Sequence, residues 1–144
     1  MEPRVVSIII KSGADPGYVR RTVAAKAPGS IVQTVRTDAI TNGFYVEMIA
    51  AQTLRANGTP NLLARKPEVD LLLRLAGTTQ ISRAIEKLGA RKGKPFLLVV
   101  AGPRKELARI VWKELGGRAL AALDLSPDEL QRIETAALLN VLNA

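Results

Sequence analysis

The chain has 144 residues, 47% of them hydrophobic, and carries 21 Lys and Arg against 13 Asp and Glu for a net charge of +8. This length and apolar content predict a single domain over residues 1–144, and no linker-like stretch divides it. The sequence has no cysteine and no histidine, which excludes disulfides, thiolate zinc sites, Ser-His-Asp triads and histidine general bases.

No segment reaches the roughly 18 continuous apolar residues of a membrane span, and the N-terminus has no signal-peptide pattern. We therefore expect a cytoplasmic protein that makes no contact with a membrane. The lack of cysteine fits a reducing compartment.

The first third of the chain predicts a strand, a helix and a second strand. The β-branched run Val5–Lys11 is typical of a strand. Asp15 is placed to cap a helix that begins at Pro16, because proline is favoured in the first turn. The alternating run Ile31–Arg36 predicts the second strand.

A second helix is expected to follow, with Thr41 or Asn42 as its N-cap. It runs through Leu54 and ends at the pair Asn57-Gly58. The segment Asn61–Pro67 reads as a connection that carries two adjacent cations.

The middle of the chain predicts a strand, a short helix and another strand. Val69–Leu75 is an almost unbroken aliphatic run, which suits a strand buried on both faces. After a turn at Gly77, apolar residues recur at helical spacing up to a stop at Gly89; they are Ile81, Ala84, Ile85 and Leu88. Phe96–Ala101 is the next predicted strand.

Two further helices are predicted in the C-terminal part. The first follows Pro103, has an apolar stripe that reaches Leu115, and ends at Gly116 and Gly117. The second begins at a capping box, Ser126-Pro127-Asp128-Glu129, and has a broad apolar side that is either docked core or a partner-binding face. The fold class is therefore α/β: a single sheet of about four strands, mixed or largely antiparallel, with helices packed against it.

The positive charge is concentrated in one segment. Residues 54–94 hold nine Lys and Arg against three Asp and Glu, whereas residues 1–53 hold six against four and residues 95–144 hold six against six. Such a local excess favours an anionic partner, the alternative being a solvated charged surface.

No established catalytic motif is present. There is no Gly-Lys-Ser or Gly-Lys-Thr P-loop, and no Gly-x-Gly-x-x-Gly follows a predicted strand. We therefore expect no catalytic residues, no metal and no cofactor. The competing interpretation is a small α/β enzyme or ligand-binding module for a phosphorylated metabolite, with Gly102 and Arg104 or Gly77 and Arg83 as its anion site.

The second predicted helix and the middle of the chain resemble one known family, the kinase-binding subunit of the KEOPS complex, which includes the human PRPK-binding protein and its archaeal counterparts. The most specific match is the pattern Leu-x-Gly-x-x-Gln-Ile at Leu75, Gly77, Gln80 and Ile81. Thr79 stands where members of the family often have a cation. The remaining matching residues are Asn42-Gly43-Phe44, Glu47, Asn61-Leu62, Ala64-Arg65, Glu68 to Arg74, and Ala84 to Gly89.

The resemblance implies a noncatalytic subunit of the machinery that makes N6-threonylcarbamoyladenosine in tRNA. In that family, the subunit docks on a small RIO-like atypical kinase, which holds the threonylcarbamoyl transferase. It also helps to recruit tRNA through the 3′ CCA end.

On this basis, two sets of site residues are predicted. The tRNA-binding set consists of Asn42, Asn61, Arg65, Lys66, Arg74, Gln80, Arg83 and Lys87. The kinase-binding set consists of Ile85, Leu88, Leu138, Leu139 and Val141. For each cation the alternative role is a solvated side chain, and for Gln80 it is capping of the turn that precedes it.

Overall fold

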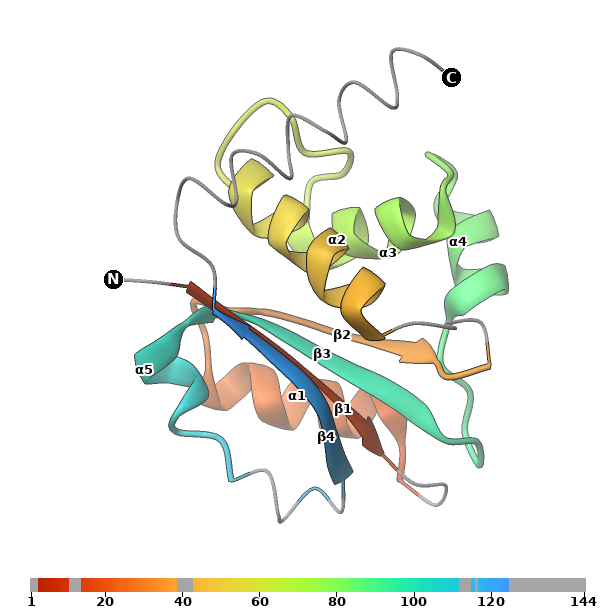
Figure 1. The fold of residues 1–144 in the computed structure, drawn as a ribbon. Helices are drawn as coiled ribbons and strands as arrows, with labels where there is room; N and C mark the ends of the chain where they lie inside the picture. The colour runs from red at the N-terminus through yellow and green to blue at the C-terminus, as the bar shows by residue number, and fades with distance from the viewer. Residues whose placement is uncertain (1–2, 11–13, 39–42, 112–114, 116, 125–144) are drawn as a thin grey trace.

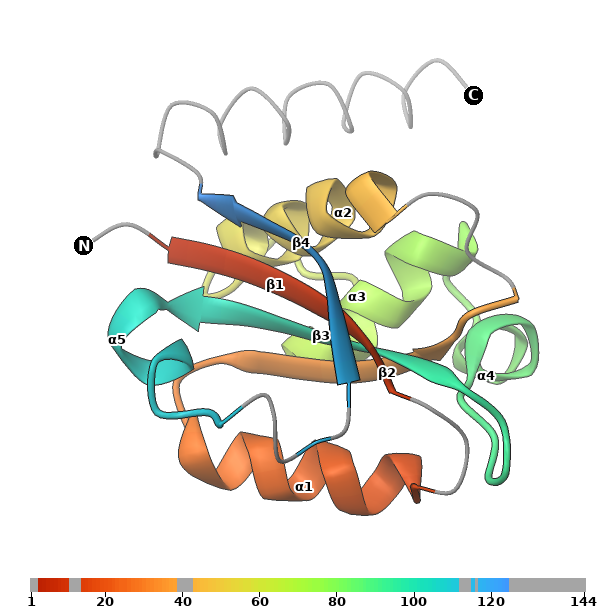
Figure 2. The ribbon, with the colours of Figure 1, turned by 60° about the horizontal axis from the view of Figure 1, so that its bottom comes forward.

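The computed structural model describes residues 3–10, 14–38, 43–111, 115 and 117–124. One sheet lies between two layers of helices (Figure 1). Helices α2 (Gly43–Ala56) and α3 (Pro67–Ala76) cover one face, and α1 (Pro16–Lys26) covers the other, as the turned view in Figure 2 also shows. Helix α4 (Ile81–Leu88) lies beside α3 at one end of the sheet.

The sheet has four strands in the order β2-β3-β1-β4, and each neighbouring pair is antiparallel. The strands are β1 (Pro3–Ile10), β2 (Ile31–Arg36), β3 (Phe96–Pro103) and β4 (Gly117–Asp124). The α/β class, the single sheet and its antiparallel character are thus confirmed.

Strand β3 lies inside the sheet and is buried from Phe96 to Gly102. Its side chains alternate between two cores because successive residues of a strand point to opposite faces. Leu97 and Val99 pack with residues of α2, α3 and α4. Leu98 and Val100 pack with residues of α1 and with Leu107.

The predicted start of the first helix is confirmed. Asp15 is the N-cap of α1, and its Oδ1 accepts a hydrogen bond from the backbone N–H of Gly17 at 3.0 Å. Pro16 occupies the first turn, where its missing N–H costs nothing. The predicted caps of α2, Thr41 and Asn42, lie outside the described residues.

The prediction of a strand over residues 69–75 is wrong, because this segment belongs to helix α3. The helix contacts α2, α4 and strand β2, and none of its residues is fully exposed, although Asp70 and Arg74 lie one turn apart on its polar side. Pro67 opens it, and Gly77 closes it in the left-handed conformation, with φ of +69°. The run is also rich in leucine, which favours helices more than Val and Ile do.

A buried carboxylate ties α3 to the preceding connection. The side chain of Asp70 is inaccessible to solvent. It accepts hydrogen bonds from the Thr53 hydroxyl at 2.6 Å, the Leu63 backbone N–H at 2.8 Å and the Arg74 Nε at 2.8 Å. Arg74 in turn donates from Nη2 to the Asn61 carbonyl at 2.9 Å. One carboxylate thereby connects α2, the connecting loop and α3.

The long helix predicted after Pro103 is also wrong beyond its first turn. Helix α5 spans only Arg104–Leu107, and the chain then turns and enters strand β4 at Gly117. Leu107 and Ile110 are buried as the apolar pattern predicts, but in a turn of helix and the bend after it. Strand β4 was not predicted, because its alanine-rich sequence has low strand propensity and its pairing with β1 is nonlocal.

The number of strands was therefore right, while one of the four was wrongly identified. The capping box at Ser126 and the terminal helix predicted after it lie outside the described residues.

Replacing Asp70 by Asn is expected to lower the free energy of unfolding by about 3–5 kcal/mol, because it removes one partner from a buried ion pair. Urea denaturation followed by circular dichroism measures this change. Asp38→Asn is the matched control, since Asp38 pairs with Arg36 at 3.0 Å on the surface with 74% of its side chain exposed. The control should lose less than about 1 kcal/mol; equal losses would contradict the role given to Asp70.

Candidate functional site

Helix α4 is only half buried, which distinguishes it from α3. Its inner side chains, Ala84 and Leu88, lie in the core. Ile81 and Ile85, one helical turn apart, are 49% and 55% exposed. The apolar stripe predicted for this helix is thus divided into a buried half and an exposed half.

Three of the four residues of the Leu-x-Gly-x-x-Gln-Ile pattern shape the turn between α3 and α4. Leu75 is buried. Gly77 closes α3 with a positive φ, a backbone conformation in which any side chain would be strained. Gln80 is the N-cap residue of α4 through its backbone, and its carbonyl accepts from Ala84 N–H at 3.1 Å. Three members of the pattern therefore build the helix–turn–helix, whereas Ile81 is exposed and contributes little to the core.

Two predicted tRNA-binding cations have structural partners. The guanidinium of Arg74 is held by Asp70 and the Asn61 carbonyl. The Lys87 ammonium donates to the Ala76 carbonyl at 3.2 Å, at the C-terminus of α3, where carbonyls lack helical partners. Both side chains stabilise the positions of α3 and α4.

The other predicted tRNA-binding residues that the structure describes are exposed. They are Asn61, Arg65, Lys66, Gln80 and Arg83. Arg65 and Lys66 lie on the loop before α3, while Gln80 and Arg83 lie at α4. The backbone of Asn61 is engaged on both sides, because its N–H donates to the Thr59 hydroxyl and its carbonyl accepts from Arg74. Asn42 lies outside the described residues.

The kinase-binding prediction falls partly on the same helix. Ile85 is exposed and accessible to a partner, whereas Leu88 is 4% exposed and packs in the core. Leu88 is therefore unsuited to direct docking. Leu138, Leu139 and Val141 lie outside the described residues.

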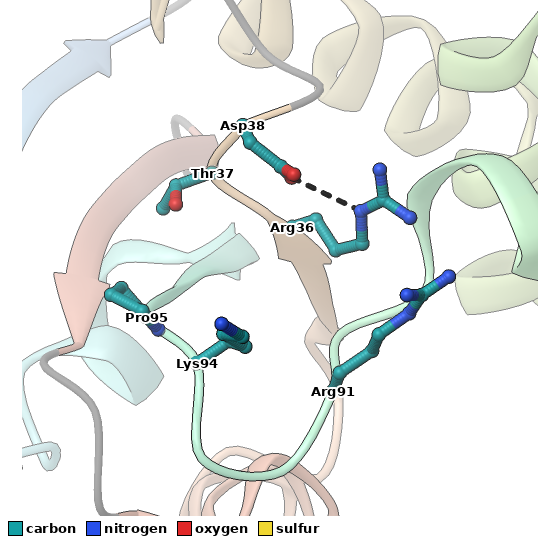
Figure 3. A pocket seen from close by; sticks show the side chains of 6 residues that line it. All are labelled: Arg36, Thr37, Asp38, Arg91, Lys94 and Pro95. Atoms are coloured by element: carbon teal, nitrogen blue, oxygen red, sulfur yellow. Dashed lines mark hydrogen bonds and ion pairs between the residues drawn. The ribbon is translucent and has the colours of Figure 1, made fainter.

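A basic pocket adjoins the C-terminal end of α4. It has a volume of about 230 Å³ and lies between the end of β2 and the loop that connects α4 to β3. Figure 3 shows the side chains that line it. They are Arg36, Thr37, Asp38, Arg91, Lys94 and Pro95.

Arg36 joins the two sides of this pocket. Its Nε pairs with the Asp38 carboxylate at 3.0 Å, and its Nη1 donates to the Glu86 carbonyl of α4 at 3.4 Å. The β2–β3 register explains the pocket's position, because Arg36 pairs with Phe96 and thereby brings Thr37 close to Pro95.

Gly89 fixes the path of the chain from α4 into the basic loop. It forms an isolated bridge with Val35 of β2. A Cβ atom at this position would lie 2.5 Å from the Ile85 carbonyl oxygen, so only glycine fits without a shift of the backbone. The bridge between Gly89 and Val35 holds the start of the loop against the edge of the sheet.

The two anion sites considered in the competing interpretation are not supported. Gly102 faces Ser30, because a Cβ there would overlap the Ser30 hydroxyl, and the following helix α5 has only four residues. Gly77 ends α3, and its backbone N–H is already donated to the Leu73 carbonyl at 2.9 Å.

Sequence reasoning recognised the loop cations Arg91 and Lys94 as part of the positive surface but missed Arg36, Thr37 and Asp38. No local signal marks these three residues, since a strand end followed by a threonine and an aspartate is common. Only the pairing of β2 with β3 brings them beside the loop.

Within the described residues, no group of three or more His, Cys, Asp or Glu side chains could hold a metal ion. No helix in the same part of the chain is long and apolar enough to cross a membrane. No protein-family model matches the sequence, and no curated protein matches it.

The two faces of α4 should respond differently to truncation. Leu88→Ala is expected to lower the free energy of unfolding by about 2–5 kcal/mol, because it empties a core position. Ile85→Ala should change it by no more than about 0.5 kcal/mol, because the side chain is exposed. Chemical denaturation of both variants measures the difference, and a comparable loss for Ile85→Ala would show that this side chain is structural.

Proposed function

We propose that this protein is a noncatalytic, RNA-binding docking subunit of the KEOPS type. In this role it binds a small RIO-like atypical kinase and helps to recruit tRNA through the 3′ CCA end for threonylcarbamoyladenosine formation. The threonylcarbamoyl transferase is then an indirect partner, held through the kinase.

The exposure of Ile81 is the observation that carries the proposal. It belongs to the sequence pattern that resembles the KEOPS subunit, yet it is 49% exposed, while Leu75 and Gly77 of the pattern have structural roles. Neighbouring exposed aliphatic side chains rimmed by polar residues are typical of interaction sites. Together with Ile85 it offers an apolar wall on α4.

Exposed cations accompany this wall on the same helix and on the loop that follows it. Arg83 is on the same helix but projects from the side opposite Ile81, and Arg91 and Lys94 are on the loop that follows. Single-stranded RNA ends are bound by neutralising the phosphates and packing the splayed bases against side chains. On this proposal Ile81 and Ile85 provide an apolar contact for a base, and the cations of α4 and its loop provide the phosphate contacts.

Two of the three buried acids in the described part of the chain, Asp70 and Glu106, have structural partners, which supports a noncatalytic role. Asp70 is saturated with hydrogen bonds from its own fold. Glu106 is 7% exposed and accepts from the Gly29 backbone N–H at 2.6 Å, which ties α5 to the turn before β2. These two carboxylates have structural partners and do not face the basic surface together.

The tRNA-binding part of the proposal predicts two separable effects. The double variant Ile81→Ser, Ile85→Ser should weaken tRNA binding by roughly tenfold or more, because about 1.5–3 kcal/mol accompanies the burial of each such side chain. Arg83→Gln should instead reduce the slope of log K against log salt by about 0.7, the value for one lost single-strand phosphate contact. Binding is measured by fluorescence anisotropy at several salt concentrations.

Tyr18→Ser provides the control, because Tyr18 is 63% exposed on α1, which covers the other face of the sheet. It should leave tRNA affinity unchanged. Equal binding of tRNA with and without the CCA end, together with unchanged affinity of the α4 variants, would overturn the proposal.

The kinase-binding part predicts a different variant. Leu139→Asp should abolish co-purification with the atypical kinase and leave the thermal midpoint unchanged, because Leu139 lies off the apolar stripe of its predicted helix. Pull-down and differential scanning calorimetry measure the two properties. Loss of folding in this variant would place Leu139 in the core and refute the docking assignment.

A further inference from the structure

The basic pocket has a charge that selects for a particular kind of anion. Three cations, Arg36, Arg91 and Lys94, face one carboxylate, Asp38, which gives a net charge of 3 − 1 = +2. A phosphomonoester carries about −1.5 to −2 at pH 7, whereas an internal phosphodiester carries a single negative charge. The charge of the pocket thus matches a phosphomonoester more closely.

The donors in the pocket also suit phosphate. Arg36 and Arg91 come from different elements, and their guanidinium groups extend toward α4 in the same direction (Figure 3). Guanidinium groups bind phosphate oxygens in a bidentate manner, and Lys94 adds a compact positive charge. Thr37 also lines the pocket at the end of β2.

The size of the pocket restricts the ligand further. Its volume of about 230 Å³ lies below the range of about 300–1,000 Å³ typical of sites that enclose a whole organic ligand. A phosphate group fits inside such a volume, while the rest of the molecule that carries it extends outward.

In the structure, the carboxylate of Asp38 is the anion that pairs with Arg36. The two groups lie 3.0 Å apart, but the side chain of Asp38 is 74% exposed, whereas that of Arg36 is 24% exposed. Asp38 can therefore turn into water at little cost, while the Glu86 carbonyl keeps Arg36 in position. Exposed ion pairs of this kind add little to stability, so a dianionic ligand can displace the carboxylate.

We propose that this pocket binds a phosphomonoester, and that Arg36 exchanges Asp38 for the phosphate when the ligand enters. Arg91 and Lys94, on the loop that faces the end of β2, neutralise the remaining charge of the phosphate. Two sources carry this group: a small phosphorylated metabolite, or the phosphorylated end of a nucleic-acid strand. The pocket does not depend on the proposed tRNA role, although it adjoins the α4 surface assigned to RNA.

The test measures binding of defined probes to the full chain by isothermal titration calorimetry. The small probes are inorganic phosphate, ribose 5-phosphate and dimethyl phosphate, the last as a diester control. The strand probes are one short RNA with a 5′-phosphate and the same RNA with a 5′-hydroxyl. We expect monoesters to bind more tightly than dimethyl phosphate by roughly tenfold, the scale of one charge-assisted hydrogen bond.

Variants then assign binding to the pocket. Lys94→Gln should weaken monoester binding by roughly tenfold. Lys92→Gln is its matched control, because Lys92 is on the same loop but lies 3.9 Å from Asp15 at the start of α1 and does not line the pocket. Asp38→Asn should tighten binding, which unfolding of the variant cannot mimic. Glu86→Gln makes the same change of net charge with a side chain outside the pocket, and should have no such effect.

The outcomes distinguish a phosphorylated metabolite from a phosphorylated strand end, and they test the phosphate site separately from the tRNA role. Tight binding of ribose 5-phosphate with no preference for the 5′-phosphorylated RNA identifies a metabolite, and a preference for that RNA identifies a strand end. Equal effects of Lys92→Gln and Lys94→Gln, or equal binding of monoester and diester, would overturn the proposal that the pocket binds a phosphomonoester. The tRNA role would still stand in that case if the double variant Ile81→Ser, Ile85→Ser binds tRNA more weakly. Each proposal can therefore be refuted without refuting the other.

Discussion

The buried carboxylate of Asp70 is the interaction on which the functional half of the molecule depends. It gathers a hydroxyl from α2, a backbone N–H from the connecting loop and a guanidinium from α3. A carboxylate inaccessible to water is tolerated only when its oxygens are fully hydrogen-bonded and its charge is paired. Because α4 packs on α3 and is held there by Lys87 at the end of α3, the position of the basic surface follows from that of Asp70.

The positive charge of the middle segment is divided between two physical roles. Arg74 and Lys87 are directed inward, to a carboxylate and to helix-terminal carbonyls, and stabilise the fold. Arg83, Arg91 and Lys94 are exposed on α4 and its following loop, where an anion can reach them. Arg36 has both roles, because its hydrogen bond to the Glu86 carbonyl connects β2 to α4 and its side chain also lines the pocket.

The candidate site lies where an edge strand meets a half-buried helix. Strand β2 is at one edge of the sheet, and the contact between Val35 and Gly89 covers part of that edge. Helix α4 buries only Ala84 and Leu88, which leaves Ile81 and Ile85 in contact with solvent. The apolar wall and the basic pocket therefore sit together at the same end of the sheet, and each can be altered without disturbing the core beneath.

The sequence by itself determined the elements whose signals are local. Asp15 followed by Pro16 defined the start of α1, and the β-branched or alternating runs of β1 and β2 identified those strands because their side chains follow the period of two. Tertiary structure decided the rest. The leucine run of α3 was read as a strand because it is nearly continuous in the sequence and the helix is covered on several sides, and β4 exists only through its pairing with β1. The tRNA-contact predictions for Arg74 and Lys87 rested on the resemblance and on local charge, and only packing shows that their side chains are held by acceptors within the fold. The pocket at Arg36 likewise required the β2–β3 register, since nonlocal pairing brings together residues that no local pattern connects.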